Sequence, residues 1–175
     1  MMQHHGKTSP MADQPQMAMN QPEQVIVRAE PAATDPIVLR LSTAKGKDPI
    51  LRATENLQLD ASVSHPAHLY CFYQGHAQAL VRIHPNRFHT DSHTDPADMV
   101  RLPDKHFNIR MEKPNVTEKV LCLATHRDAA PALPSRIYAR DLAPIPGVSL
   151  HDVLNEFKKI DSLLAYDVVT VKTIP

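Results

Sequence analysis

The residues best suited to chemistry in this chain are His84, His89 and His93, which share one polar, turn-rich stretch with Asp91 and Asp95. Imidazole and carboxylate groups at short spacing are the ligands that zinc and similar divalent cations use. His89 and His93 are four residues apart, but the stretch is not predicted to be helical, so this spacing does not ensure a shared face. A divalent-metal site is therefore one hypothesis, and solvated loop histidines are the favoured alternative.

Motifs for other kinds of catalysis are missing from the sequence. There is no HExxH and no GxSxG, and four scattered glycines cannot build a P-loop or a GxGxxG turn. Cys71 and Cys122 both lie in the middle of apolar stretches, where a thiol is inert rather than activated. We therefore expect no enzyme, no catalytic residues and no cofactor.

The two cysteines leave more than one arrangement open, because a pair can form one disulfide or remain as buried free thiols. The chain has no CxxC, and the separation between Cys71 and Cys122 suits a bridge between non-consecutive strands. Such a bridge would contribute roughly 3–5 kcal/mol in the loop-entropy model, and it would indicate an oxidising compartment. We predict that the two cysteines lie on adjacent or facing strands and are bridged.

Short strands are predicted to position these residues. Alternation of apolar and polar side chains is typical of half-buried strands, and runs that are apolar on both faces are typical of central ones. Sixteen prolines also disfavour long helices. The predicted strands are Ile37–Leu41, Leu57–Val63, Ala67–Gln74, Ala77–His84, Met99–Leu102, Phe107–Met111, Glu118–Thr125 and Asp167–Thr173.

One helix is predicted near residues 150–160. Ser149 can cap it, with Asp152 as the partner of a capping box, and Pro146 and Gly147 precede it as helix breakers. The apolar residues of this stretch fall on one stripe, so the helix should pack on one face or end of the sheets. The stripe consists of Leu150, Val153, Leu154 and Phe157.

The first 35 residues have a different composition, rich in Gln, Met, Pro and His, with a single short apolar run at Val25, Ile26 and Val27. Such a segment cannot bury enough surface to offset its ordering entropy alone. One reading is a flexible linker. The other is an extended arm whose residues Gln24–Ala29 add as a strand to a sheet edge, its own or a neighbour's, and so contact other protein subunits.

The charge balance and the hydropathy of the sequence limit the classes of partner that we expect. Lys+Arg and Asp+Glu balance at 19 each, and no apolar run approaches the length of a membrane span. Arg82, Arg87 and Arg101 lie near aromatic strand residues, but 5% aromatic content is low for a stacking platform. We therefore expect no nucleic-acid partner and no transmembrane segment.

The order of these segments resembles the bacterial domain-of-unknown-function 4384 family over Leu51–Asp128. The most specific part is the aromatic strand Leu69–Tyr73 followed by a hairpin and the Pro-Asn turn at Pro85 and Asn86. One departure is Lys113–Thr117, which stands where the family usually has a glycine turn. The resemblance implies an accessory module of secreted, lipid-anchored or multidomain envelope proteins, and it implies no reaction.

Together these observations predict a mainly β protein. We expect an arm over residues 1–35 and an immunoglobulin-like β-sandwich with one C-terminal amphipathic helix over residues 36–175. The expected function is a non-catalytic interaction or structural module of the bacterial cell envelope, as a subunit or accessory of a larger assembly. A histidine-dependent metal-binding domain is the alternative. The expected location is periplasmic, or extracellular and outer-membrane associated, with the leader absent from this chain; a cytoplasmic location stays open.

Overall fold

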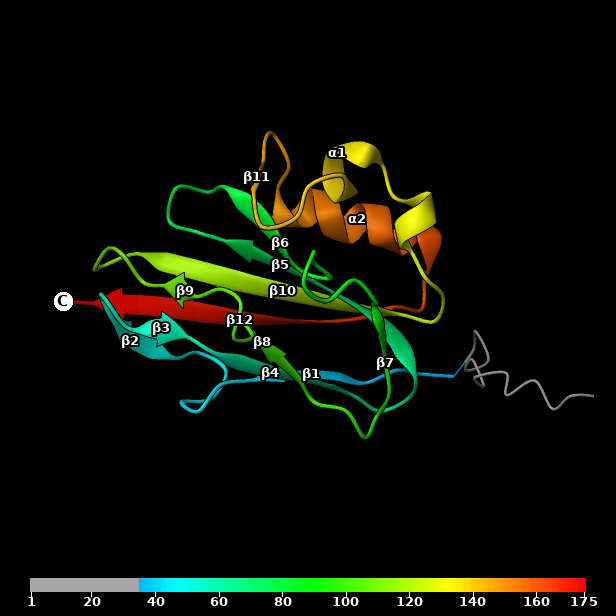
Figure 1. Cartoon of the computed structure of the whole chain (residues 1–175), viewed down its shortest axis with the longest axis horizontal. Helices are drawn as coiled ribbons and strands as arrows, with labels where there is room; N and C mark the ends of the chain where they lie inside the picture. Colours follow the sequence, from blue (N-terminus) through cyan, green and yellow to red (C-terminus); the bar gives the residue numbers. More distant parts are fainter. Residues whose placement is uncertain (1–34) are drawn as a thin grey trace, which may run out of the picture.

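Strands make up most of the structure, a computed structural model that describes residues 35–175 (Figure 1). The prediction of a mainly β protein is confirmed. The twelve strands in this part of the chain are β1 (Leu39–Ser42), β2 (Ile50–Arg52), β3 (Asn56–Leu57), β4 (Leu59–Val63), β5 (Ala67–Gln74), β6 (Leu80–His84), β7 (His93–Thr94), β8 (Val100–Leu102), β9 (Ile109–Arg110), β10 (Thr117–Thr125), β11 (Pro144–Ile145) and β12 (Ala165–Ile174). The helices are a 3₁₀ turn (Ala130–Ala132), α1 (Ser135–Tyr138) and α2 (Leu150–Ile160).

A large sheet runs through the middle of the molecule, with strand order β11-β6-β5-β10-β12-β2 and with β7 paired to β5. All of these pairs are antiparallel except β12 with β2, which are parallel. The central strands β5 and β10 are buried on both faces over most of their length. That explains why their sequences are apolar at consecutive positions rather than at alternate ones.

The two faces of the large sheet are covered differently (Figure 1). α1 and α2 lie on one face, and the small sheet β1-β4-β8 lies on the other, beside the two-stranded pair β3-β9. Two separate apolar cores result, one beneath the helices and one beneath the small sheets. The helices thus cover part of one face of the large sheet, which makes a three-layered arrangement there. Likeness to an immunoglobulin domain stays a prediction.

Helix α2 confirms the prediction for residues 150–160. The hydroxyl of Ser149 accepts a hydrogen bond from the Asp152 amide, and the Asp152 carboxylate accepts one from the Ser149 amide, both at 3.0 Å. This capping box fixes where the helix begins. Val153 and Phe157 are fully buried, and the Phe157 ring lies 5.0 Å from that of Tyr70 on β5.

Several predicted boundaries were wrong. The strand predicted from Ala77 begins at Leu80, and only Ile109–Arg110 of the stretch 107–111 is a strand. The histidine-rich stretch is not all loop, because His93–Thr94 pairs with β5. Within residues 35–175 no helix is long and apolar enough to cross a membrane. The predicted interaction residues Val25, Ile26 and Val27 lie outside the described residues.

Candidate functional site

The predicted disulfide is present and joins the two central strands. Cys71 of β5 stands directly opposite Cys122 of β10, their Cα atoms are 4.1 Å apart, and their sulfur atoms are bonded. Both residues are fully buried in the core beneath the small sheets. The bridge therefore fixes two strands that the chain separates by 51 residues.

A buried arginine organises the turn that follows β6. Arg82 is 8% exposed and donates hydrogen bonds to three backbone carbonyls, those of Pro85 (3.0 Å), Tyr138 (2.9 Å) and Arg140 (3.3 Å). Its guanidinium also lies 3.8 Å from the centre of the Tyr138 ring. Burial lowers the pKa of Arg82 from its ordinary value. This side chain ties residues 138–140 to the end of β6, which is a structural role.

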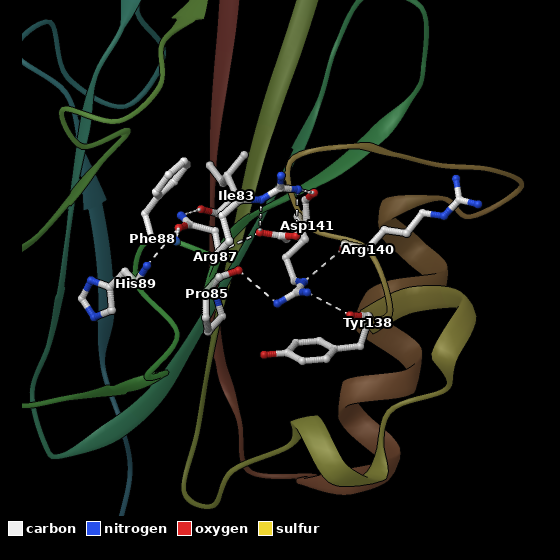
Figure 2. Close-up of polar contacts among 10 residues, drawn as sticks. Ile83, Pro85, Arg87, Phe88, His89, Tyr138, Arg140 and Asp141 are labelled. Atoms are coloured by element: carbon white, nitrogen blue, oxygen red, sulfur yellow. Dashed lines mark hydrogen bonds and ion pairs between the residues drawn. The ribbon is translucent and has the colours of Figure 1, made fainter.

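The Pro-Asn turn itself is held by side-chain contacts, which Figure 2 shows. The Asn86 amide donates to the carbonyl of Ile83 (2.8 Å), and its oxygen accepts from the amides of Phe88 (2.8 Å) and His89 (3.1 Å). Arg87 pairs with the Asp141 carboxylate at 3.2 Å. The segment from Tyr138 to Asp141 therefore lies alongside the turn, while Phe88 and His89 extend to its other side (Figure 2).

The three predicted metal ligands line one cavity of about 360 Å³ beyond this turn. The rings of His84 and His89 are 5.0 Å apart, and His93 contacts the ring of His68 at 5.5 Å. His84 is 2% exposed. Burial, together with the charges of His89 and Arg82, lowers its pKa to about 3, so His84 is neutral at physiological pH.

The same cavity holds further polar groups. Asp98 and Asp104 line it, and so does Thr94, whose hydroxyl is buried without a hydrogen-bond partner in the described part of the chain. Across residues 35–175, however, no group of three or more His, Cys, Asp or Glu side chains is arranged to hold a metal ion. The structure thus brings the three histidines to one cavity, and metal binding by them stays a prediction.

A second hollow is larger and more apolar, and we call it the β6 groove. Its volume is about 580 Å³, and it lies between the face of the large sheet and residues 107–112. Tyr73, Val81 and Ile83 form its sheet wall, with Phe107 and Ile109 on the other side. The groove exists because the small sheet β1-β4-β8 does not extend over this part of β5 and β6.

A buried carboxylate belongs to the wall of the β6 groove. Glu118 of β10 is 2% exposed and accepts hydrogen bonds from the Tyr73 hydroxyl and from the amide and imidazole of His76 at 3.2 and 3.3 Å. Burial, followed by the contact with Glu118, raises the pKa of Tyr73, so its hydroxyl remains a donor. Among residues 35–175 Glu118 has no lysine or arginine partner.

A second carboxylate stands near the first. Glu112 is exposed, lines the β6 groove, and acts on Tyr73 through its charge, which further raises the pKa of that hydroxyl. Arg110 is the basic residue on the same rim. The groove therefore combines apolar walls with two carboxylates and one guanidinium, so its acidic end favours a cation.

The sequence analysis missed the β6 groove, although one signal pointed to it. Glu118, Val120, Cys122 and Ala124 alternate along β10 and all face the core beneath the small sheets. A glutamate at an inward-facing position of a central strand is rare unless it is paired. The register of β10 relative to Cys122 would have identified it.

Comparison with known proteins gives one result. Residues 50–128 match the model of a domain of unknown function, DUF4384. Over these residues the chain is similar to the DUF4384 family. The match confirms the resemblance found in the sequence, and it spans β2 through β10, including both cysteines, the three histidines and most of the β6 groove. No curated protein and no solved structure matches the chain.

Proposed function

We propose that this protein, which is similar to DUF4384 domains over residues 50–128, is a non-catalytic interaction module of the bacterial cell envelope, acting as a subunit or accessory of a larger protein assembly. The observation that carries the proposal is the β6 groove with its buried Glu118. An apolar hollow with a few polar groups is the usual form of a binding site. The matching partner is a polypeptide segment that is apolar and carries one lysine or arginine.

The electrostatics of Glu118 support a cationic partner. A buried carboxylate loses its hydration, and the loss is offset only by hydrogen bonds or by an opposite charge. Tyr73 and His76 supply hydrogen bonds, but neither is a permanent cation. An incoming ammonium or guanidinium group would supply the missing charge, and Glu112 at the rim would attract it.

The buried disulfide supports the envelope location. Disulfides form and persist in oxidising compartments such as the bacterial periplasm and the cell surface. The bridge between Cys71 and Cys122 is fully buried between the two central strands. We propose a periplasmic or extracellular, outer-membrane-associated module on that basis.

Site-specific photo-crosslinking in intact cells tests the interaction. A photo-reactive amino acid placed at the exposed groove position Arg110 should give one discrete adduct with an identifiable protein, and Glu112→Arg in the same chain should abolish it. The same probe at Lys158, an exposed position on α2, is the matched control and should give no such adduct. Free monomer at both positions, in native envelopes, would refute an interaction through the groove.

A second candidate function is divalent-metal binding at the histidine cavity. The observation that favours it is the combination of neutral, buried His84 with His89 and with the unpartnered hydroxyl of Thr94. Equilibrium dialysis with Zn²⁺ and Cu²⁺ should show one bound ion for the wild type and none after substitution of His84, His89 and His93 by alanine. Since His84 is buried, the single exchange His89→Ala controls for unfolding. Equal stoichiometry in all three proteins would exclude the site.

A further inference from the structure

We propose that the β6 groove receives residues Val25–Arg28 of a second copy of the same chain, with Arg28 facing Glu112 and Glu118. This inference rests on the proposed function, since it names the occupant of the same groove. The occupant lies in the part of the chain before residue 35, and its sequence matches the groove in polarity, in charge and in reach.

The apolar part of the match is the run Val25, Ile26 and Val27, the single run of three β-branched residues in residues 1–35. In an extended peptide alternate side chains point to the same side, so Ile26 and Arg28 project together. They are then about 7 Å apart along the segment. Ile26 would contact the apolar wall of the groove at Val81, Ile83 and Phe107. Arg28 would then reach the acidic end of the groove.

The charged part of the match concerns Glu118. It is buried, and its partners in residues 35–175 are Tyr73 and His76 rather than a lysine or arginine. Arg28 is the one basic residue next to the apolar run. A guanidinium can donate to two carboxylates at once because its N–H groups form a planar fork. Glu112 and Glu118 therefore offer it acceptors at the rim and in the wall.

Reach favours a second copy over the same molecule. The carbonyl of Asp35 accepts a hydrogen bond from the His126 imidazole at 2.5 Å, which fixes the start of the described chain at the end of β10. Glu118 lies eight residues back along β10, roughly 26 Å away at strand spacing. The seven residues from Arg28 to Asp35 span at most about 25 Å. In Figure 1 the described chain begins near β7, and β9 lies toward the opposite end.

Within one molecule the segment would have to run straight at strand-like spacing even when the Arg28 side chain adds to its reach, whereas a second copy can approach without that restriction. The contact is then head-to-tail, because the arm of one copy and the groove of another are different surfaces. Such contacts produce rings or open filaments rather than closed dimers. The protein would assemble by passing its arm to the next copy.

Charge exchange tests the pairing in the full-length chain. Sedimentation of the wild type should show association that grows with concentration, and Arg28→Glu and Glu112→Arg should each weaken it about tenfold or more. An equimolar mixture of the two variants should associate again, because the introduced glutamate then meets the introduced arginine. Lys7→Glu makes the same charge change in the arm away from the apolar run and should leave association unchanged.

The outcomes separate this inference from the proposed function. Glu112 is exposed and forms no hydrogen bond or ion pair within residues 35–175, so its exchange should leave the melting temperature unchanged. A wild type that stays monomeric at every concentration, or a mixture that fails to recover, overturns docking of Val25–Arg28. If the probe at Arg110 still captures a different envelope protein in that case, the proposed function stands without this inference. If it captures nothing, both fall.

Discussion

Each face of the large sheet carries an apolar core, but the two cores are covered in different ways. On the helix face, Tyr70 and Phe72 meet Phe157, and all three are fully buried. On the other face, the small sheet covers Cys71 and Cys122 but stops short of Tyr73, where the β6 groove opens. One face is closed by packing, while the other keeps a hollow that contains a buried carboxylate. We therefore expect substitutions on the helix face to affect stability, and those in the β6 groove to affect the proposed binding.

The largest expected effect comes from Phe157→Ala on the closed face. Truncating a fully buried phenylalanine typically costs about 3–5 kcal/mol, a large part of the roughly 5–15 kcal/mol that stabilises a domain. The melting temperature should therefore fall substantially, while Lys158→Ala on the exposed side of the helix should change it little. If Phe157→Ala left stability intact and abolished association instead, α2 would be the docking surface and the comparison of the faces would be reversed.

Removing the disulfide should have the next largest effect. Replacing Cys71 and Cys122 together by alanine should lower the free energy of unfolding by about 2–4 kcal/mol, because the unfolded chain loses a crosslink. Chemical denaturation measures the change. Alkylation without reductant, followed by mass spectrometry, should label no thiol in protein purified from the envelope. Two labelled thiols would argue against both the bridge and an oxidising compartment.

Two neighbouring residues on β6 point to opposite faces of the large sheet, so truncating each one compares the packing of the two faces directly. Leu80 is fully buried beneath the helices, and Val81 is half-buried in the wall of the groove. Leu80→Ala should cost about 2–5 kcal/mol, as in a filled core. Val81→Ala should cost less than about 1 kcal/mol, because the side chain already borders the hollow. Thermal unfolding of both variants measures the difference, and equal losses would show that the groove is part of the packed core.

The smallest effect is a pH dependence at the corner where the described chain begins. His126 hydrogen-bonds with its Nδ1 to Asp161 (2.7 Å) and with its Nε2 to the carbonyl of Asp35 (2.5 Å). Burial acts to lower the pKa of His126, but these hydrogen bonds and the Asp161 charge outweigh it, so the pKa is raised. Burial likewise acts to raise the pKa of Asp161, but its hydrogen bonds with His126 lower it.

The directions of the two pKa shifts define the pH range in which His126 and Asp161 stabilise the fold. A raised histidine pKa contributes stability below its unfolded value of 6.5, and this stability is lost as the pH rises through the folded value. A lowered aspartate pKa contributes stability above 3.8, which is lost as the pH falls. The wild type should therefore lose stability between about pH 6 and 8 by a small amount that His126→Gln does not show. If the stability of the two proteins changed with pH in the same way, the pair of His126 and Asp161 would be excluded as the cause.

Much of the fold could be predicted because its signals are local. Ser149 and Asp152 mark the start of α2, and the double-faced apolar runs of β5 and β10 mark the centre of the sheet. The position of each cysteine within those strands was compatible with a bridge but also with two buried thiols, and the pairing of β5 with β10 decided between them. The β6 groove could not be predicted, since it depends on how far the small sheet extends over the large one. The hydrogen bonds of Glu118 come from residues 42 and 45 positions away in the chain. A single sequence does not show that residues so far apart are close in space.

The parallel pairing of β12 with β2 has a consequence for synthesis of the protein. Ile50 on β2 pairs with Lys172 on β12, and their neighbour β10 pairs with β12 along nearly its whole length. A ribosome must therefore complete residue 174 before the sheet can close. Until then β10 presents an open edge rich in Val, Leu and Ala, the kind of edge that invites pairing with other chains. The edge of β10 therefore stays unpaired from the synthesis of residue 125 until β12 is made.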